Sequence, residues 1–394
     1  MDINAYQPKE GDMPELTILV GTTKGAFLIS GGADRSGWEV TGPHCDGWAI
    51  NHLAGDPKTG TIWAGGGGDF HGAGVFRSED GGKSWERTRL TEGQMDGWAK
   101  EEPEMAAMFG ITGEKLPFGT DFKQIWSLHR AGDTLYAGTK PASLLKSTDD
   151  GKTWELVEGL TNHPSREEWS PGGAGLVLHT IISDPEDPKK MWVGISAAGI
   201  FATEDGGETW ERRNRMTNAA AHEGHDHPAG PSGGEVGHCV HNLRRAPGAG
   251  DLLYQQNHHG VWRSADGGRN WEERTEGLPS PFGFPVQVHP RDPQMLWVLP
   301  LEENNRVPMD AAAAVWRSTD GGETWEAKRD GLPQKGCYFT VLRQAMAGDT
   351  AEPAGVYFGT NSGSVFASLD EGESWIEVAE HLPTVLTVEV LERV

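Results

Sequence analysis

Histidine is the residue type whose positions in this sequence point most directly to chemistry. The chain contains 15 histidines, and His179 and His241 each stand five residues before a pair that ends a strand, Asp184-Pro185 and Ala246-Pro247. These matched positions put both imidazoles at one height on neighbouring strands, where alternate residues face the same side. Imidazoles from separate strands are common ligands of divalent metals. The predicted metal ligands are His179, His238, His241 and His258.

The same residues favour hydrolase or lyase chemistry on a small polar or anionic substrate. A metal-bound water or a histidine would act as the base, and Arg166 would orient an anionic group. The predicted catalytic residues are His179, His241, Arg166 and Glu235. Two plainer interpretations stay open: the histidines only hydrogen-bond water in a polar interior, and Arg166 forms a surface ion pair with Glu167 or Glu168. The sequence does not choose among zinc, manganese, calcium and magnesium, and it indicates no organic cofactor.

Other histidines are weaker candidates for the same chemistry. They are His52 and His71, and His71 lies in the enlarged loop Gly65 to Gly74. The tract His222-Glu-Gly-His225-Asp-His227 has the composition of a metal-binding loop, but its Ala, Gly and Pro neighbours favour unspecific affinity.

An internal repeat defines the elements that must position these residues. A short box that runs from Ser or Thr through Asp and Gly to Trp occurs six times, with a seventh, degenerate copy at Ser30 to Trp38. From Trp38 to Trp375 the copies recur about every 56 residues, a period typical of repeat architectures. The six boxes are Ser78 to Trp85, Ser147 to Trp154, Thr203 to Trp210, Ser264 to Trp271, Ser318 to Trp325 and Ser368 to Trp375.

Each box resembles the Asp-box of the BNR repeat family, found in sialidases, xyloglucanases, sortilin-type ectodomains and photosystem II assembly factors. The resemblance implies an all-β, seven-bladed β-propeller with four antiparallel strands per blade. Residues 1–394 would form this single domain. Blade 1 would comprise about 16–40 plus 383–391, because the C-terminal strand matches the innermost strands that follow Leu278-Pro and Leu332-Pro. The box residues themselves are structural: Asp accepts bonds from turn amides, and Gly supplies a positive φ.

Long insertions interrupt the repeat on what should be one face of the propeller. They span 86–121, 155–175, 211–237 and 301–314, and the stretch from Trp98 to Phe109 has a helical composition. Loops longer than about 12 residues are usually functional or disordered. The sequence therefore predicts the site on this face, at the mouth of the central channel.

Composition narrows the classes of partner. The 34 basic and 58 acidic residues give a net charge of −24, which disfavours nucleic acid and anionic lipid. The low hydrophobic content of 36% and the absence of a long apolar run predict no membrane span. The N-terminus lacks a secretory pattern, so we expect a cytoplasmic protein. Cys45, Cys239 and Cys337 are too few and too widely spaced for a disulfide framework or a CxxC zinc site.

Two classes of function remain after the families that share the box are considered. The sequence lacks the Phe/Tyr-Arg-Ile-Pro motif of sialidases, and xyloglucanases use two propellers where this chain has one. A glycosidase also needs two facing carboxylates, and no spacing singles out a pair. The first class is an enzyme with a histidine pocket at the channel mouth. The second resembles the photosystem assembly factors, a non-catalytic scaffold that binds a protein partner through its insertion face.

Overall fold

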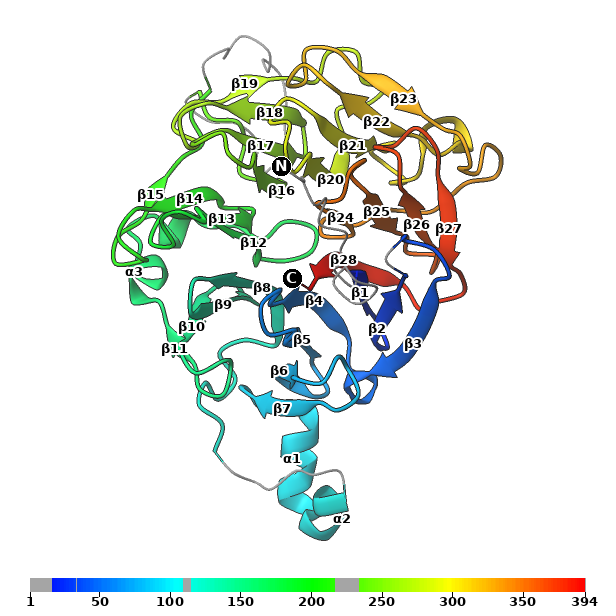
Figure 1. The fold of residues 1–394 in the computed structure, drawn as a ribbon. Helices are drawn as coiled ribbons and strands as arrows, with labels where there is room; N and C mark the ends of the chain where they lie inside the picture. The colour runs from blue at the N-terminus through cyan, green and yellow to red at the C-terminus, as the bar shows by residue number, and fades with distance from the viewer. Residues whose placement is uncertain (1–15, 33, 109–114, 217–233, 394) are drawn as a thin grey trace, which may run out of the picture.

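Antiparallel sheets arranged around a common centre make up the molecule (Figure 1). The computed structural model describes residues 16–32, 34–108, 115–216 and 234–393. Within these residues the strands form five four-stranded sheets and one eight-stranded sheet. The prediction of an all-β propeller is confirmed.

The strands follow one another around the ring in chain order. The first sheet contains β1 (Leu16–Thr22), β2 (Gly25–Ser30), β3 (Glu39–His44) and β28 (Val385–Glu392). The eight-stranded sheet contains β4 (Ile50–Gly55), β5 (Ile62–Gly68), β6 (Gly72–Ser78), β7 (Glu86–Arg89), β8 (Gln124–Ala131), β9 (Thr134–Lys140), β10 (Leu144–Ser147) and β11 (Glu155–Leu156). Next come β12 (Val177–Ser183), β13 (Met191–Ser196), β14 (Gly199–Thr203) and β15 (Glu211–Arg212), then β16 (Val240–Arg245), β17 (Leu253–Asn257), β18 (Gly260–Ser264) and β19 (Glu272–Glu273). The last two sheets are β20 (Gly283–Val288), β21 (Leu296–Pro300), β22 (Val315–Ser318) and β23 (Glu326–Lys328), and β24 (Met346–Gly348), β25 (Val356–Gly359), β26 (Val365–Ser368) and β27 (Ile376–Ala379).

The sheet count corrects the expectation of seven separate four-stranded blades. Five sheets are separate, whereas β4 to β7 and β8 to β11 share one sheet because Gly67 of β5 pairs with Gln124 of β8. Gly67 has a φ of 137° and lies close to backbone oxygens, so a side chain there would keep the two strands apart.

The C-terminal strand closes the ring. β28 pairs antiparallel with β1, from Leu16 opposite Glu392 to Thr22 opposite Val385. Val385 and Val388 of β28 are fully buried in the adjoining core. The strand expected from sequence at 383–391 therefore completes the first sheet.

Helices occur in the insertions that follow outer strands. After β7, α1 (Gln94–Glu101) and α2 (Pro103–Met108) project from the ring (Figure 1). Shorter helical turns are η1 (Cys45–Gly47), α3 (Glu158–Thr161), η2 (Arg166–Glu168) and η4 (Met309–Ala311). The helix expected around Trp98 to Phe109 thus begins earlier, at Gln94. The common face of the four insertions stays a prediction, and most of 211–237 lies outside the described residues.

Tryptophan side chains tie neighbouring parts of the ring together. Trp63, Trp192 and Trp297 occupy the second strand of their four-strand units and are almost fully buried. Their indole N–H groups donate to backbone oxygens in the Asp-box of the following unit, at Asp150, Gly267 and Glu371. Each bond is 2.8 to 3.0 Å long.

The Asp-boxes form compact turns of one design. In the box ending at Trp210, the hydroxyl of Thr203 and the backbone N–H of Thr209 donate to Asp205 Oδ1, and the Thr209 hydroxyl donates to Oδ2. The bonds from Thr209, foremost that of its hydroxyl, lower the pKa of Asp205 to about 2. Both oxygens of the Asp205 carboxylate thus accept hydrogen bonds within the turn, as expected for a structural role.

Replacing Asp266 with alanine tests this structural role. Asp266 accepts bonds from Ser264 Oγ, Asn270 N and Asn270 Nδ2, and the box ends at the fully buried Trp271. We expect the free energy of unfolding to fall by about 1 to 3 kcal/mol, because three donors lose a charged acceptor. Urea unfolding measures the change. Asp133→Ala, at an exposed turn, should change stability by no more than about 0.5 kcal/mol, and equal effects of the two variants would contradict the prediction.

Candidate functional site

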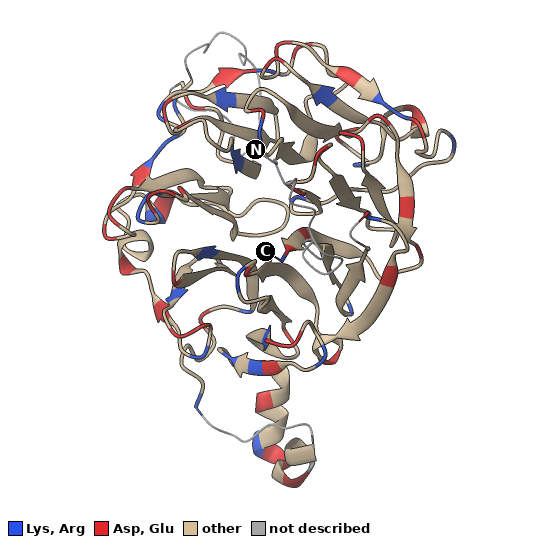
Figure 2. Ribbon diagram, in the orientation of Figure 1, with Lys and Arg blue, Asp and Glu red and all other residues tan. Residues whose placement is uncertain are grey.

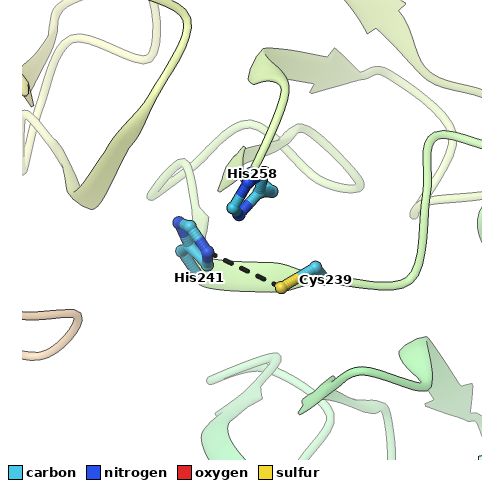
Figure 3. Close-up of side chains that lie close together, drawn as sticks. All are labelled: Cys239, His241 and His258. Carbon is cyan, nitrogen blue, oxygen red and sulfur yellow. Dashed lines mark hydrogen bonds between the residues drawn. The ribbon is translucent and has the colours of Figure 1, made fainter. Parts of the chain in front are cut away.

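Three potential metal ligands converge where β16 begins (Figure 3). Cys239 precedes β16, His241 lies in it, and His258 lies in the turn between β17 and β18. One donor atom from each residue lies within 4.8 Å of the others, and Cys239 Sγ is 3.7 Å from His241 Nε2. Cys239 and His241 share a face because they are two residues apart on extended backbone.

The imidazole of His241 is oriented for ligation. Its Nδ1 lies 2.6 Å from the carbonyl oxygen of Gly283, which can only accept, so Nδ1 carries the proton. The lone pair therefore resides on Nε2, the nitrogen nearest Cys239. Burial, together with the charge of Arg343, keeps the pKa of His241 well below its ordinary value. His241 is thus a neutral donor at physiological pH, as metal binding needs.

His258 is held by a carboxylate. Its Nε2 lies 3.1 Å from Glu303 Oε1, and its backbone N–H donates to the carbonyl oxygen of Cys239. A carboxylate on one ring nitrogen is the arrangement that orients metal-ligating histidines and fixes their tautomer. The ring of His258 meets that of His241 edge-on, with centroids 5.5 Å apart.

The separation of Cys239 and His241 in this donor set fits a zinc-type ion. Zinc–sulfur and zinc–nitrogen bonds of about 2.3 and 2.0–2.1 Å at a tetrahedral angle put sulfur and nitrogen about 3.6 Å apart. The 3.7 Å between Cys239 Sγ and His241 Nε2 agrees with this separation. Burial raises the pKa of the Cys239 thiol, so the thiol itself is unreactive unless a cation binds.

Two other predicted ligands lie outside this cluster. His179 is fully buried on β12, where Nδ1 lies 2.8 Å from Thr180 Oγ1 and Nε2 has no hydrogen-bond partner. Burial lowers the pKa of His179 to about 3. His238 instead pairs with Glu235, with 2.6 Å between Nε2 and Oε2. Adjacent residues of an extended chain face opposite sides, which separates His238 from Cys239.

The remaining predicted catalytic residues are occupied in other contacts. Glu235 forms ion pairs with His238 and Arg212. The Arg166 guanidinium stacks over the ring of Trp169, 4.5 Å from its centroid. Glu168 pairs with Arg212 instead. Among the described residues, Arg166 therefore joins neither the metal ligands nor the surface ion pair considered as its alternative.

His52 and His71, two weaker histidine candidates, make contacts outside the cluster of Cys239, His241 and His258. His52 pairs with Glu389, at 3.3 Å between Nε2 and Oε1. His71 stacks on Trp48 with ring centroids 4.7 Å apart, and burial lowers its pKa. The tract from His222 to His227 lies outside the described residues.

An inner cavity of about 330 Å³ collects polar groups from several inner strands. Glu389 of β28 is central, because it pairs with His52 of β4 and Arg244 of β16. Burial by itself would raise the pKa of Glu389. The hydrogen bond from His52 and the charge of Arg244 outweigh burial, and the pKa of Glu389 lies below its ordinary value. Other lining residues include Ser127, His129, His179, Asn242 and Gln344. Sequence analysis assigned no role to this Glu389 cluster.

A second cavity of about 310 Å³, which we call the outer cavity, carries positive charge and shares the lining residue Gln344 with the inner cavity. Arg306 and Arg343 line it beside Phe284 of β20. The guanidinium carbons lie 5.7 and 5.0 Å from the Phe284 centroid, and His241 packs on the same ring at 4.7 Å. Phe284 therefore links this cavity to the cluster of Cys239, His241 and His258.

Charged residues are concentrated elsewhere in the molecule. Figure 2 shows Asp, Glu, Lys and Arg mainly along outer strands and loops, while most inner-strand ribbon is uncharged. Salt bridges such as Arg213 to Glu204 and Arg317 to Glu373 lie among these outer segments. By contrast, Arg306 and Arg343 of the outer cavity form no salt bridge with a described residue.

Sequence analysis missed Cys239, Arg306 and Arg343. A signal for Cys239 was present in His238-Cys239-Val240-His241, because alternation pairs Cys239 with His241 rather than His238 with His241. Both arginines lie in connections between strands, and no period of the sequence places them beside His241 or Phe284.

Comparisons with known proteins find an Asp-box repeat in this chain. The BNR/Asp-box repeat family model matches residues 316–327. A xyloglucanase of Acetivibrio thermocellus is 26% identical over 280 residues, which is 62% of this chain and 30% of that protein. The chain therefore contains a BNR/Asp-box repeat, and the matched residues include one of the boxes found in the sequence.

Solved structures give the same fold. The GH74 enzyme of Niastella koreensis superposes with a TM-score of 0.57 and 17% identity, over 95% of this chain and 53% of that one. YCF48 bound to a D1 peptide superposes with a TM-score of 0.51 and 15% identity, over 95% and 86%. At these identities the likeness concerns the fold.

The match to the xyloglucanases is partial. The chain aligns with 25% to 30% of the length of three curated xyloglucanases. Their names refer to a polysaccharide, which differs from the small polar substrate expected from sequence. Within the described residues, no helix has the length and apolar character needed to cross a bilayer.

Proposed function

We propose that this chain is a hydrolase whose centre lies between Cys239, His241 and His258. The observation that carries the proposal is the convergence of three donor atoms within 4.8 Å where β16 begins. Xyloglucanase relatives support the hydrolase class, and they favour a saccharide as substrate.

These three residues would hold a divalent transition metal, with zinc as the best match to one thiolate and two imidazoles. When bound, such an ion supplies a Lewis acid and an acidified water at its open position. The chain contributes the rest: Gly283 orients His241, Glu303 orients His258, and Phe284 shields one side of the His241 ring. No contact among the described residues supports a role in this centre for Arg166, Glu235 or His179.

Glycoside cleavage by a carboxylate pair has less support within this chain. That mechanism needs two carboxylates about 5 to 10 Å apart. Among the described residues that line the inner and outer cavities, Glu389 is the one carboxylate, and it is engaged by His52 and Arg244. We therefore propose metal-assisted hydrolysis.

We also propose the domain organisation, the placement of the insertions and the location of the protein. The sheets follow one another in a single ring that β28 closes, which supports a single domain spanning 1–394. The four insertions would share one face. A thiolate ligand also needs a reducing compartment, and three unpaired cysteines support a cytoplasmic location.

Metal content and its link to activity test the proposal. We expect about one equivalent of zinc in untagged protein after dialysis, and none in Cys239→Ala or His241→Ala. Hydrolysis of chromogenic ester and glycoside substrates should disappear with a chelator and return with added zinc. His71→Ala, outside the cluster, is the matched control. Metal-free protein that cannot be loaded with zinc would overturn the metal centre.

A second candidate, protein binding, has one specific observation in its favour. Phe70, Trp98 and Met108 expose apolar surface on or beside the projecting α1 and α2, and Met108 is 83% exposed. Exposed apolar patches mark interaction sites, and the YCF48 structure contains a bound peptide. Removing α1 and α2 should abolish partner binding but preserve the melting temperature if this candidate is right.

A further inference from the structure

We infer that the outer cavity binds an anionic group of the substrate, a carboxylate or a phosphate ester, between Arg306 and Arg343. This inference rests on the proposed function, because it names the chemical class of ligand beside the proposed centre. The observations that support it are the two arginines, the cavity that they line and the other residues of the cavity wall.

The charge of the cavity is positive and unbalanced. None of its lining residues is acidic. Among the described residues no carboxylate lies within ion-pair distance of Arg306 or Arg343, and Arg343 Nε is a buried donor with no hydrogen-bond partner. In a chain with a net charge of −24, two such arginines are unusual. A buried Nε–H of Arg343 without an acceptor is costly, and an anion that accepts from it would relieve that cost.

The shape and the other walls favour an organic anion over a bare ion. Trp126, Leu342, Leu386 and Phe284 supply apolar or aromatic surface, which suits a ring or chain attached to the charge. Asn361 accepts from the backbone N–H of Thr340 through its side-chain oxygen, so its amide N–H groups stay available as donors. A volume of about 310 Å³ accommodates a group of the size of one sugar.

The position ties the anion to the proposed centre. Arg343, Arg306 and His241 all lie against Phe284. The uncharged part of a ligand held by the two arginines would therefore lie beside the cluster of Cys239, His241 and His258.

Calorimetric titration with three sugars of similar size tests the inference. Glucuronate carries a carboxylate, glucose 6-phosphate carries a phosphate ester, and glucose carries no charge. We expect at least one of the anionic sugars to bind about tenfold or more tightly than glucose, as charge-assisted hydrogen bonds predict. Which one binds distinguishes the carboxylate from the phosphate.

Substitutions locate the binding. Arg306→Gln and Arg343→Gln should each weaken binding of the anionic sugar by about tenfold or more. Arg269→Gln is the control, because Arg269 pairs with Glu204. Arg306 is exposed, so its variant should fold even if Arg343→Gln does not, and thermal melting checks both.

The outcomes separate this inference from the proposed function. Equal binding of glucose and the anionic sugars, or unchanged binding in both arginine variants, would overturn the anion site. Zinc content should stay near one equivalent in Arg306→Gln. Anion binding that depends on the arginines in a protein without zinc would support the site and contradict the metal centre.

Discussion

The protein is expected to lose several kcal/mol of stability between pH 7 and pH 4. Burial lowers the pKa of His129 to about 4 and that of His179 to about 3, against an ordinary value of 6.5. Below pH 6.5 the unfolded chain takes up protons at both residues while the native chain does not. The free energy of unfolding therefore falls by about 1.4 kcal/mol per pH unit for each histidine until the pH approaches its native pKa. Above pH 7 both states are neutral at these positions, and the effect vanishes.

Urea unfolding at pH 7, 5.5 and 4, with a chelator present, measures this dependence. His129→Gln and His179→Gln should each flatten the slope by about 1 kcal/mol per pH unit, because glutamine does not titrate in this range. His381→Gln, at an exposed turn, is the matched control and should follow the parent chain. A stability that is constant from pH 7 to pH 4 would show that these imidazoles are protonated in the native channel.

Ending the chain at Thr384 is expected to abolish the folded monomer. The truncation removes β28, including the buried side chains of Val385, Val388 and Leu391. Burial of each contributes about 1.5 to 3 kcal/mol, and the exposed edge of β1 loses its pairing along seven residue pairs. The total approaches the whole net stability of a typical domain, about 5 to 15 kcal/mol.

Circular dichroism and size-exclusion chromatography of the truncated chain measure the outcome. We expect loss of the thermal transition and association through the open edge of β1. A synthetic peptide of residues 382–394 added in trans should restore the transition, because it supplies the missing strand. A truncated chain that melts within a few degrees of the parent would mean that β28 does not close the ring.

The fold could be predicted from the sequence because its signal is repeated. Six boxes with Asp, Gly and Trp at fixed positions define the hairpins, and the match of the C-terminal strand to other inner strands defined the closure. The merging of two four-strand units was not predicted. It depends on one pair, Gly67 with Gln124, and on the space around Gly67.

The site could be predicted only where it follows strand periodicity. The matched heights of His179 and His241 correctly marked two inner strands, but the side chains do not meet, because His241 turns toward Gly283 and Phe284. Cys239 belongs to no CxxC or disulfide pattern, and its alternation with His241 is the one sequence signal that marks it. Arg306 and Arg343 come from connections whose paths no sequence pattern specifies.

The tryptophan bonds between neighbouring units have a consequence for how the ring responds to force or heat. Trp63, Trp192 and Trp297 each reach across to the turn that shapes the next unit. Loosening one unit therefore withdraws a hydrogen bond and a large aromatic surface from the turn of its partner unit. The three bonds join the units in three successive pairs, so we expect the two units of a pair to open together rather than one at a time.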